Sequence, residues 1–231
     1  MQDEPSFDAP DSWDALWSLV GEGLLGGVHH ALNNRVAALS AISQVLGIGM
    51  PDAAPLVASL EGEVDRLEHA VAMISLLRRA RSRRAEPVQL PELAASLPPL
   101  LQQHGDLKET RFEIPADPGL VPAWAERDLL TRVLLALMLA TGLEAERRGG
   151  RVVRVEYGSD EGVVLLGVAV VPGGGGAGLR LEPPRGLDAR AAAEAAREMD
   201  GELQAIAGSS CPAAYTLRLP SLLALGGEAM A

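Results

Sequence analysis

Apolar residues recur at helical spacing through the first third of the chain, in two stretches. The first stretch runs from Asp11 to about Leu46 without a proline, and the second opens after Asp52 and continues to Leu77. Steps of three and four residues are typical of a helix whose apolar face packs in a bundle. The positions are Leu25, Val28, Leu32, Val36, Leu39, Ile42 and Leu46 in the first stretch, and Leu56, Leu60, Val64, Leu67, Val71, Ile74 and Leu77 in the second.

The connection between these two helices is short and contains strong stop signals. Gly47, Gly49 and Pro51 follow the first helix closely. A short turn makes the two helices antiparallel neighbours. A lone hairpin of two helices cannot hide both apolar stripes, whereas a second copy forming a four-helix bundle would. The pattern therefore predicts a homodimer.

The remaining two thirds of the chain mixes helical and strand-like patterns. The arginine-rich stretch 78–87 indicates a linker at the end of the second helix. After it we expect helices over 90–104, 123–148 and 189–199, and strands over 111–114, 151–157, 163–171, 202–207 and 213–219. A turn is expected at 158–160 and a glycine-rich loop at 173–178. The fold class is predicted as α+β, with a helical hairpin domain over 11–84 and an α/β sandwich over 88–220.

Charge and composition narrow the possible partners. The formal net charge is -11, which argues against nucleic acid or an anionic membrane, because both require dense positive charge on the protein. Cys211 is the only cysteine, so neither an internal disulfide nor a cysteine metal cluster can form. No apolar run approaches the roughly 20 residues that cross a bilayer, and the acidic start lacks the basic end of a signal peptide. We expect a cytoplasmic protein with a soluble partner.

One segment of the first helix carries candidate chemistry. His30 lies off the apolar stripe, so its ring is predicted to face solvent, and Asn34 lies one turn later on the same face. A neutral imidazole nitrogen is a good phosphoryl acceptor. Gly26 and Gly27 precede His30 by one turn and would let a docking protein approach closely. The neighbouring His29 is nearer the stripe and is expected to be partly packed.

Segment 30–39 resembles the phosphoacceptor box of the sensor histidine kinases. In that box a histidine is followed by an acid, then by Asn or Thr four residues on, then by a small and aliphatic run. In this chain the segment lies in a predicted helical hairpin of the length that the family has. His69 and His104 lie outside this pattern and are expected to be structural or solvated.

The C-terminal domain resembles the ATPase-like domain of the same kinases. Segments 196–203 and 215–220 look like the last helix and the closing strand of that domain. With the hairpin, the resemblance covers about residues 15–220. It implies a dimeric four-helix bundle followed by an α/β sandwich of the histidine-kinase ATPase type.

The departures from the family concern nucleotide binding. The family's long helix carries an asparagine that holds magnesium, and the candidate positions here are Ala136 and Ala140. The loop 172–176 has no carboxylate at its head, and the second glycine box is reduced to 186–188. No Lys-Ser or Lys-Thr follows the glycines, which excludes a Walker-type loop. We expect no stably bound cofactor and no ATP-dependent autokinase activity.

The acid that follows the family's histidine is Ala31 in this chain. What survives is phosphoryl exchange between His30 and an aspartyl phosphate on a response-regulator receiver domain. There the receiver supplies the magnesium, and Asn34 would position the incoming group. The chain resembles stand-alone histidine phosphotransferases that pair a dimeric hairpin with a degenerate ATPase-like domain.

Two other functions remain open from the sequence. A non-catalytic pseudokinase scaffold would bind a response regulator or a kinase without carrying phosphate, and Ala31 favours it. An active ATP-dependent kinase comes third, because Ala140 and Pro172 stand where the family's nucleotide-binding residues would be.

Overall fold

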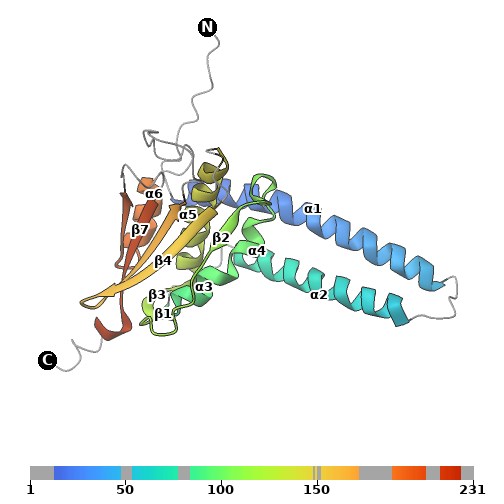
Figure 1. The fold of residues 1–231 in the computed structure, drawn as a ribbon, viewed down its shortest axis with the longest axis horizontal. Coiled ribbons are helices and arrows are strands. Elements are labelled where there is room, and N and C mark those ends of the chain that lie inside the picture. Colours follow the sequence, from blue (N-terminus) through green and yellow to red (C-terminus); the bar gives the residue numbers. More distant parts are fainter. Residues whose placement is uncertain are drawn as a thin grey trace, which may run out of the picture.

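The structure is a computed structural model that describes residues 13–47, 54–77, 84–147, 149, 152–171, 189–206 and 214–224. Helices α1 (Trp13–Gly47) and α2 (Ala54–Leu77) form an antiparallel hairpin that projects from an α/β unit (Figure 1). The predicted hairpin is therefore confirmed. Within it, Arg35 Nη1 of α1 lies 3.3 Å from Glu63 Oε2 of α2. In the part of the chain that the structure describes, no helix is long and apolar enough to cross a membrane.

The α/β unit contains a five-stranded sheet in the order β2-β4-β5-β7-β6. The central strands alternate buried and half-buried residues, as expected when one face of a sheet carries the core. Strand β2 runs parallel to β4, and the other neighbours are antiparallel. The strands are β2 (Arg111–Glu113), β4 (Val152–Asp160), β5 (Val163–Val170), β6 (Glu202–Ile206) and β7 (Ala214–Pro220).

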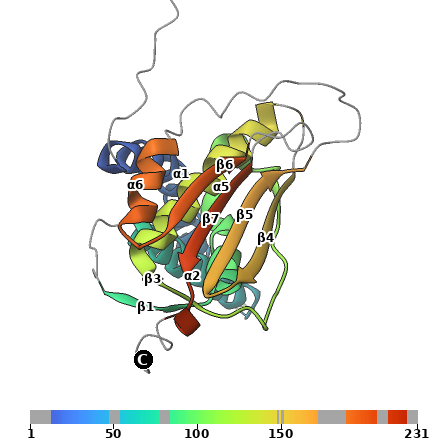
Figure 2. The ribbon, with the colours of Figure 1, turned by 90° about the vertical axis from the view of Figure 1, so that its left-hand side faces the viewer.

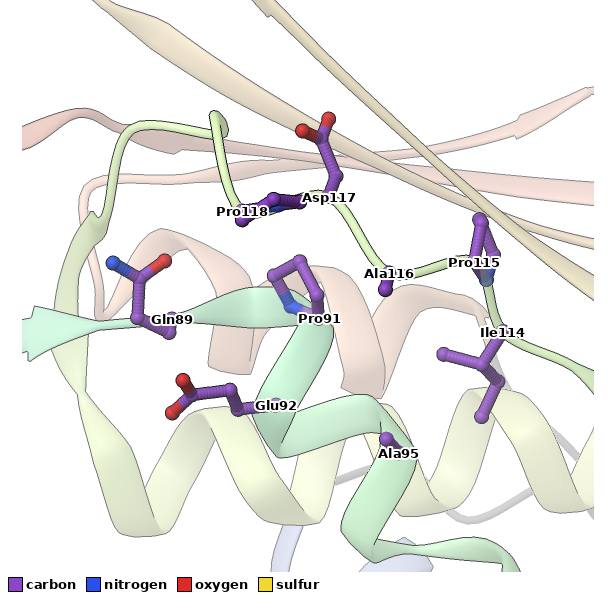
Figure 3. Close-up of a pocket in the computed structure, with 9 residues that line it drawn as sticks. All are labelled: Gln89, Pro91, Glu92, Ala95, Ile114, Pro115, Ala116, Asp117 and Pro118. Carbon is purple, nitrogen blue, oxygen red and sulfur yellow. The ribbon is translucent and has the colours of Figure 1, made fainter.

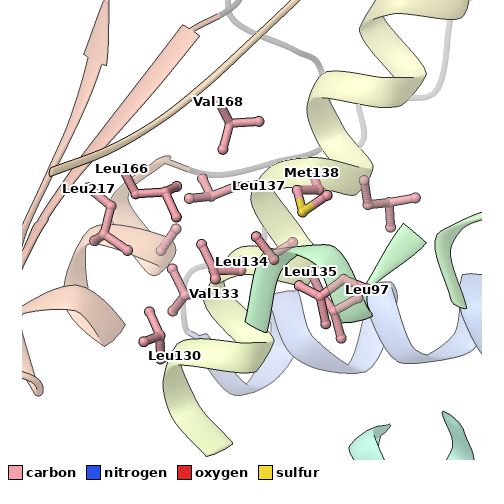
Figure 4. Packing of buried hydrophobic residues seen from close by; sticks show 14 of the residues in the cluster. Leu97, Leu130, Val133, Leu134, Leu135, Leu137, Met138, Leu166, Val168 and Leu217 are labelled. Atoms are coloured by element: carbon pink, nitrogen blue, oxygen red, sulfur yellow. The ribbon is translucent and has the colours of Figure 1, made fainter. Parts of the chain in front are cut away.

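One face of this sheet is covered by α5 (Arg127–Arg147) and α6 (Ala189–Arg197), as Figure 2 shows. Helix α5 is the centre of the core, and residues all round it are buried. Its side toward the sheet packs on β5 and β7, and another side packs on Leu97 (Figure 4). The residues drawn toward the sheet are Leu130, Val133, Leu134 and Leu137, opposite Leu166, Val168 and Leu217.

The prediction of one continuous helix over 90–104 is wrong. Two helices, α3 (Leu90–Ser96) and α4 (Pro98–Leu101), stand in its place, and a short 3-10 helix, Gly105–Leu107, follows them. Pro98 has no backbone N–H and cannot continue the hydrogen bonds of α3, but it suits the first turn of a new helix.

The predicted helix 123–148 begins later than expected, because its first residues form a strand. Strand β3 (Ala123–Glu126) pairs antiparallel with β1 (Ala85–Val88). Most of β1 falls within the stretch 78–87, for which a linker was expected. Strand β3 runs directly into α5, so its apolar residues extend the helical pattern in sequence. The final helix and the last two strands are confirmed within two residues.

The turn predicted at 158–160 is also wrong, because β4 and β5 pair as far as Asp160 and Val163. The turn consists of Glu161 and Gly162, which have φ angles of 34° and 87°. Two-residue hairpins of this kind need positive φ at both positions, which glycine adopts without strain. The predicted loops 173–178 and 186–188 lie outside the described residues.

The hydrophobic core continues from the α/β unit into the first half of α1. Six apolar side chains of this helix are at most 5% exposed and belong to the same cluster as α5 and the sheet. They are Trp13, Leu16, Trp17, Val20, Leu24 and Val28. Helix α1 is therefore shared between the hairpin and the α/β unit.

Tyr215 is buried in the sheet and Tyr157 is half-buried, and their hydroxyl groups have no hydrogen-bond partner within the described ranges. Burial raises the pKa of Tyr157 to about 12. Burial and, to a lesser degree, the nearby carboxylate of Glu144 raise the pKa of Tyr215 further. Both shifts favour the neutral phenol in the folded state.

We predict that the free energy of unfolding falls as the pH rises above 10. In the unfolded state the tyrosines ionise near pH 10, whereas in the folded state their raised pKa values keep them neutral. The unfolded state is therefore stabilised by ionisation first, and the free energy of unfolding falls from pH 10 through pH 12. Tyr215→Phe should leave stability at pH 7 nearly unchanged and make the decline above pH 10 shallower. Urea unfolding at a series of pH values checks this. An unchanged decline in the variant would show that Tyr215 does not contribute to it.

Candidate functional site

His30 and Asn34 lie on the exposed side of α1, one helical turn apart. The Asn34 amide nitrogen is 3.2 Å from His30 Nε2, and both side chains are exposed. An amide nitrogen can only donate, so Nε2 accepts and the neutral ring carries its proton on Nδ1. The lone pair on Nε2 therefore points at the Asn34 amide, and a small shift of this exposed side chain would free it.

His29 does not pack as predicted. Its side chain is exposed, and Nε2 lies 3.5 Å from the Asn33 amide nitrogen. The reason is that the apolar side of α1 nearest to it is itself uncovered in a single chain: Leu25 is 43% exposed and Val36 58%. The site thus presents two adjacent histidines, each with an asparagine one turn later.

The two glycines before the histidines have different surroundings. A side chain at Gly26 would meet nothing, so this position is open to a partner as expected. A side chain at Gly27 would collide with the backbone carbonyl of Gln103, in the segment that follows α4. The expectation that Gly27 admits a docking protein is therefore wrong, because the α/β unit of the same chain already occupies the space.

The segment that meets α1 is held by its own hydrogen bonds. His104 Nδ1 accepts from the backbone N–H of Asp106 at 3.3 Å and caps the 3-10 helix. The other edge of the ring faces Gly23, where an added Cβ would lie 3.5 Å away. His104 is thus structural, in agreement with the expectation, and it fixes the chain beside the Gly27 contact.

A cation–π contact attaches the start of α1 to α5. The Arg132 guanidinium carbon lies 5.2 Å from the centre of the Trp17 ring, and Trp13 stacks on Trp17 at 6.3 Å. Arg132 is only 3% exposed. Such a contact is worth more when it is shielded from water. The aromatic pair therefore holds the two parts of the chain in one relative position.

Positions 136 and 140 follow Arg132 at successive helical turns of α5 and share one side of it. Ala136 is 1% and Ala140 8% exposed. A methyl group offers no donor to magnesium, which requires oxygen ligands. Within the described ranges, no group of three or more His, Cys, Asp or Glu could hold a metal ion. Ala136 and Ala140 therefore offer no ligand to magnesium on this side of α5.

His30 and Asn34 stay predicted site residues, and the sequence did not predict the contacts between α1 and the α/β unit. The missed residues are Trp17, Gln103, His104 and Arg132. A usable pattern was present for the first of these, because Trp13, Leu16, Trp17, Val20, Leu24 and Val28 repeat at helical spacing. Nothing in the sequence identified Gln103 as the neighbour of Gly27.

No protein-family model matches the chain, and no curated protein sequence matches it either. Among solved structures, the chain is similar to the histidine kinase AdeS of Acinetobacter baumannii, with a TM-score of 0.44 and 17% identity over 84% of this chain and 98% of that one. It is also similar to full-length ShkA in complex with AMPPNP, with a TM-score of 0.46 and 14% identity. That alignment covers 87% of this chain and 46% of the other.

The Gly27 contact predicts opposite effects for substitutions at two neighbouring glycines. Gly27→Ala forces the Gln103 backbone away and should lower the free energy of unfolding by about 1–3 kcal/mol. Gly26→Ala meets open space and should raise it by up to about 1 kcal/mol, because alanine favours helix. Urea unfolding of both variants measures this. Equal stabilisation of both would show that α1 does not touch Gln103 in solution.

Proposed function

We propose that this chain is a histidine phosphotransferase of a two-component relay, in which His30 exchanges a phosphoryl group with aspartates of response-regulator receiver domains. The observation that carries the proposal is the exposed imidazole of His30, whose Nε2 is held by Asn34 at 3.2 Å on an open side of the hairpin. The resemblance of segment 30–39 to a phosphoacceptor box supports the same chemistry.

The transfer needs little from this chain beyond a placed nucleophile. The Nε2 lone pair attacks phosphorus, a P–N bond forms, and the P–O bond to the receiver aspartate breaks, releasing its carboxylate. The ring is then a phosphoimidazolium, which can lose the Nδ1 proton to solvent. In the reverse transfer Nδ1 takes a proton back from solvent, and the ring leaves phosphorus as neutral imidazole. Asn34 moves from Nε2 to an oxygen of the incoming phosphoryl group, which its amide can donate to.

The α/β unit acts here as a docking platform. Its segment 102–106 lies beside α1 at Gly27, one turn from His30, and the aromatic contact at Arg132 keeps it in place. A receiver that approaches His30 therefore meets the hairpin and this segment together. The buried alanines on α5 leave magnesium to the receiver.

Phosphotransfer assays test the proposal. We expect label from a phosphorylated receiver of the same cell to reach the wild-type chain, and His30→Ala to abolish it. Asn34→Ala should slow the transfer about tenfold by removing a positioning donor. The matched controls His29→Ala and Asn33→Ala should transfer normally, because the relay assigns them no role. Incubation with labelled ATP and magnesium should give no label.

Other results of this assay have definite meanings. Label from ATP would contradict the expectation that the chain has no ATP-dependent autokinase activity. Binding of the receiver without label would instead favour the scaffold function, which Ala31 supports, because an acid next to the histidine is missing. Label retained in His30→Ala would contradict the assignment of the acceptor.

We also propose that the hairpin pairs with a second copy of itself. Helix α2 carries a row of valines at steps of seven residues, with Val57 44%, Val64 38% and Val71 53% exposed. A row with this spacing matches the seam of a helical bundle, and burying it removes apolar surface from water. On α1, Leu25 and Val36 add to the uncovered apolar surface.

A charge in the valine row should dissociate the dimer. Val64→Glu places a carboxylate in the proposed seam, and we expect a monomer in light scattering at concentrations where the wild type is dimeric. Ala58→Glu is the control, since Ala58 is exposed and lies about 100° round the helix from Val57. A monomeric wild type, or a dimeric Val64→Glu variant, would contradict this interface.

A further inference from the structure

A cavity of about 420 Å³ lies between the start of α3 and the segment 114–118, which leads from β2 toward β3 (Figure 3). All nine residues that line it come from 89–95 and 114–118, and none belongs to α1 or α2. The cavity is therefore separate from His30 and from the proposed dimer seam.

The walls of the cavity are rigid. Pro91, Pro115 and Pro118 contribute rings whose backbone φ angle is fixed and whose side chains have no rotamer freedom to lose. A cavity with such walls is already formed before binding, so a ligand does not have to order it. Its volume lies in the range of small-molecule sites.

The lining divides into an apolar end and an acidic end. Figure 3 shows Ala95 and Ile114 at one end, with Gln89 and Glu92 at the other. Asp117 stands at the upper rim, where its Oδ1 accepts from the Gly119 backbone N–H at 3.1 Å. None of the nine lining residues is basic.

We propose that this cavity binds an organic cation, a protonated amine or guanidinium, attached to an apolar body. The body would pack on Ala95, Ile114 and the proline rings, and the charged head would lie at Glu92 with Gln89 beside it. The Asp117 carboxylate points away from the cavity (Figure 3), so the Glu92 carboxylate and the net charge of -11 are what disfavour an anion. The inference does not depend on phosphoryl transfer at His30.

Three probes of matched shape test it on the full chain: benzylamine, benzyl alcohol and benzoate. They share one ring and differ in charge, and binding is followed by NMR shifts of the backbone amides near the cavity. We expect saturable shifts with benzylamine only. Equal binding of the neutral or anionic probe, or no binding of benzylamine, would overturn the proposal.

Variants locate the two ends of the site. Glu92→Gln keeps the shape and removes the charge, and should weaken benzylamine about fivefold, as suits a partly exposed ion pair. Glu156→Gln is the control, because Glu156 is an exposed carboxylate on β4 away from the cavity. Ala95→Leu fills the apolar end from an exposed helix position and should abolish binding. Unchanged affinity in both Glu92→Gln and Ala95→Leu would place the binding elsewhere.

The cation could be a free amine or a side chain of another protein, and a short peptide distinguishes them. Acetyl-Gly-Arg-Gly-amide is compared with the same peptide carrying neutral citrulline. Displacement of benzylamine by the arginine peptide alone would indicate a side chain inserted by a partner. Displacement by neither peptide would indicate a free amine.

Discussion

The burial of the first four turns of α1 against the helical layer of the α/β unit is the contact on which the rest of the arrangement depends. Six side chains there are almost inaccessible. At roughly 1.5–3 kcal/mol for each buried apolar side chain, their burial contributes on the order of 10 kcal/mol, an upper figure because unfolded chains are partly compact. This equals the net stability of a typical domain. Separating α1 from α5 would therefore unfold the protein rather than open it.

That attachment fixes the position of the α/β unit relative to the part of α1 that carries His30. Here Gly27 is in contact with Gln103, and Trp17 covers Arg132. His30 itself is exposed in the single chain, so a second protein can reach its imidazole. The same fixed position gives a partner a continuous surface made from both parts of the chain.

The repetitive parts of the structure could be predicted from sequence, and the contacts between them could not. Helix α1 and the strands β5 and β7 have clear periods of three to four and of two residues. Strand β3 was missed because it runs directly into a helix without a turn residue, and β1 because most of it lies in the arginine-rich stretch that predicted a linker. His29 was misplaced because periodicity identifies an apolar stripe but not whether one chain covers it. The proximity of Gly27 to Gln103 depends on how two distant segments pack, which no local pattern contains. The predicted boundary between 84 and 88 stays a prediction.

Helix α1 runs without interruption for 35 residues, from the aromatic pair in the core to the tip of the hairpin. In a continuous helix each residue advances the direction of the next side chain by about 100°. The direction of the His30 side chain is therefore fixed by its distance in sequence, two residues, from Val28, the last residue of the buried face. A single insertion or deletion between them would rotate the imidazole toward another side of the hairpin, although every chemical group would still be present. Insertions and deletions should therefore be tolerated in the loops and not in this part of α1, because the number of helical residues sets both the distance of His30 from the core and the direction of its side chain.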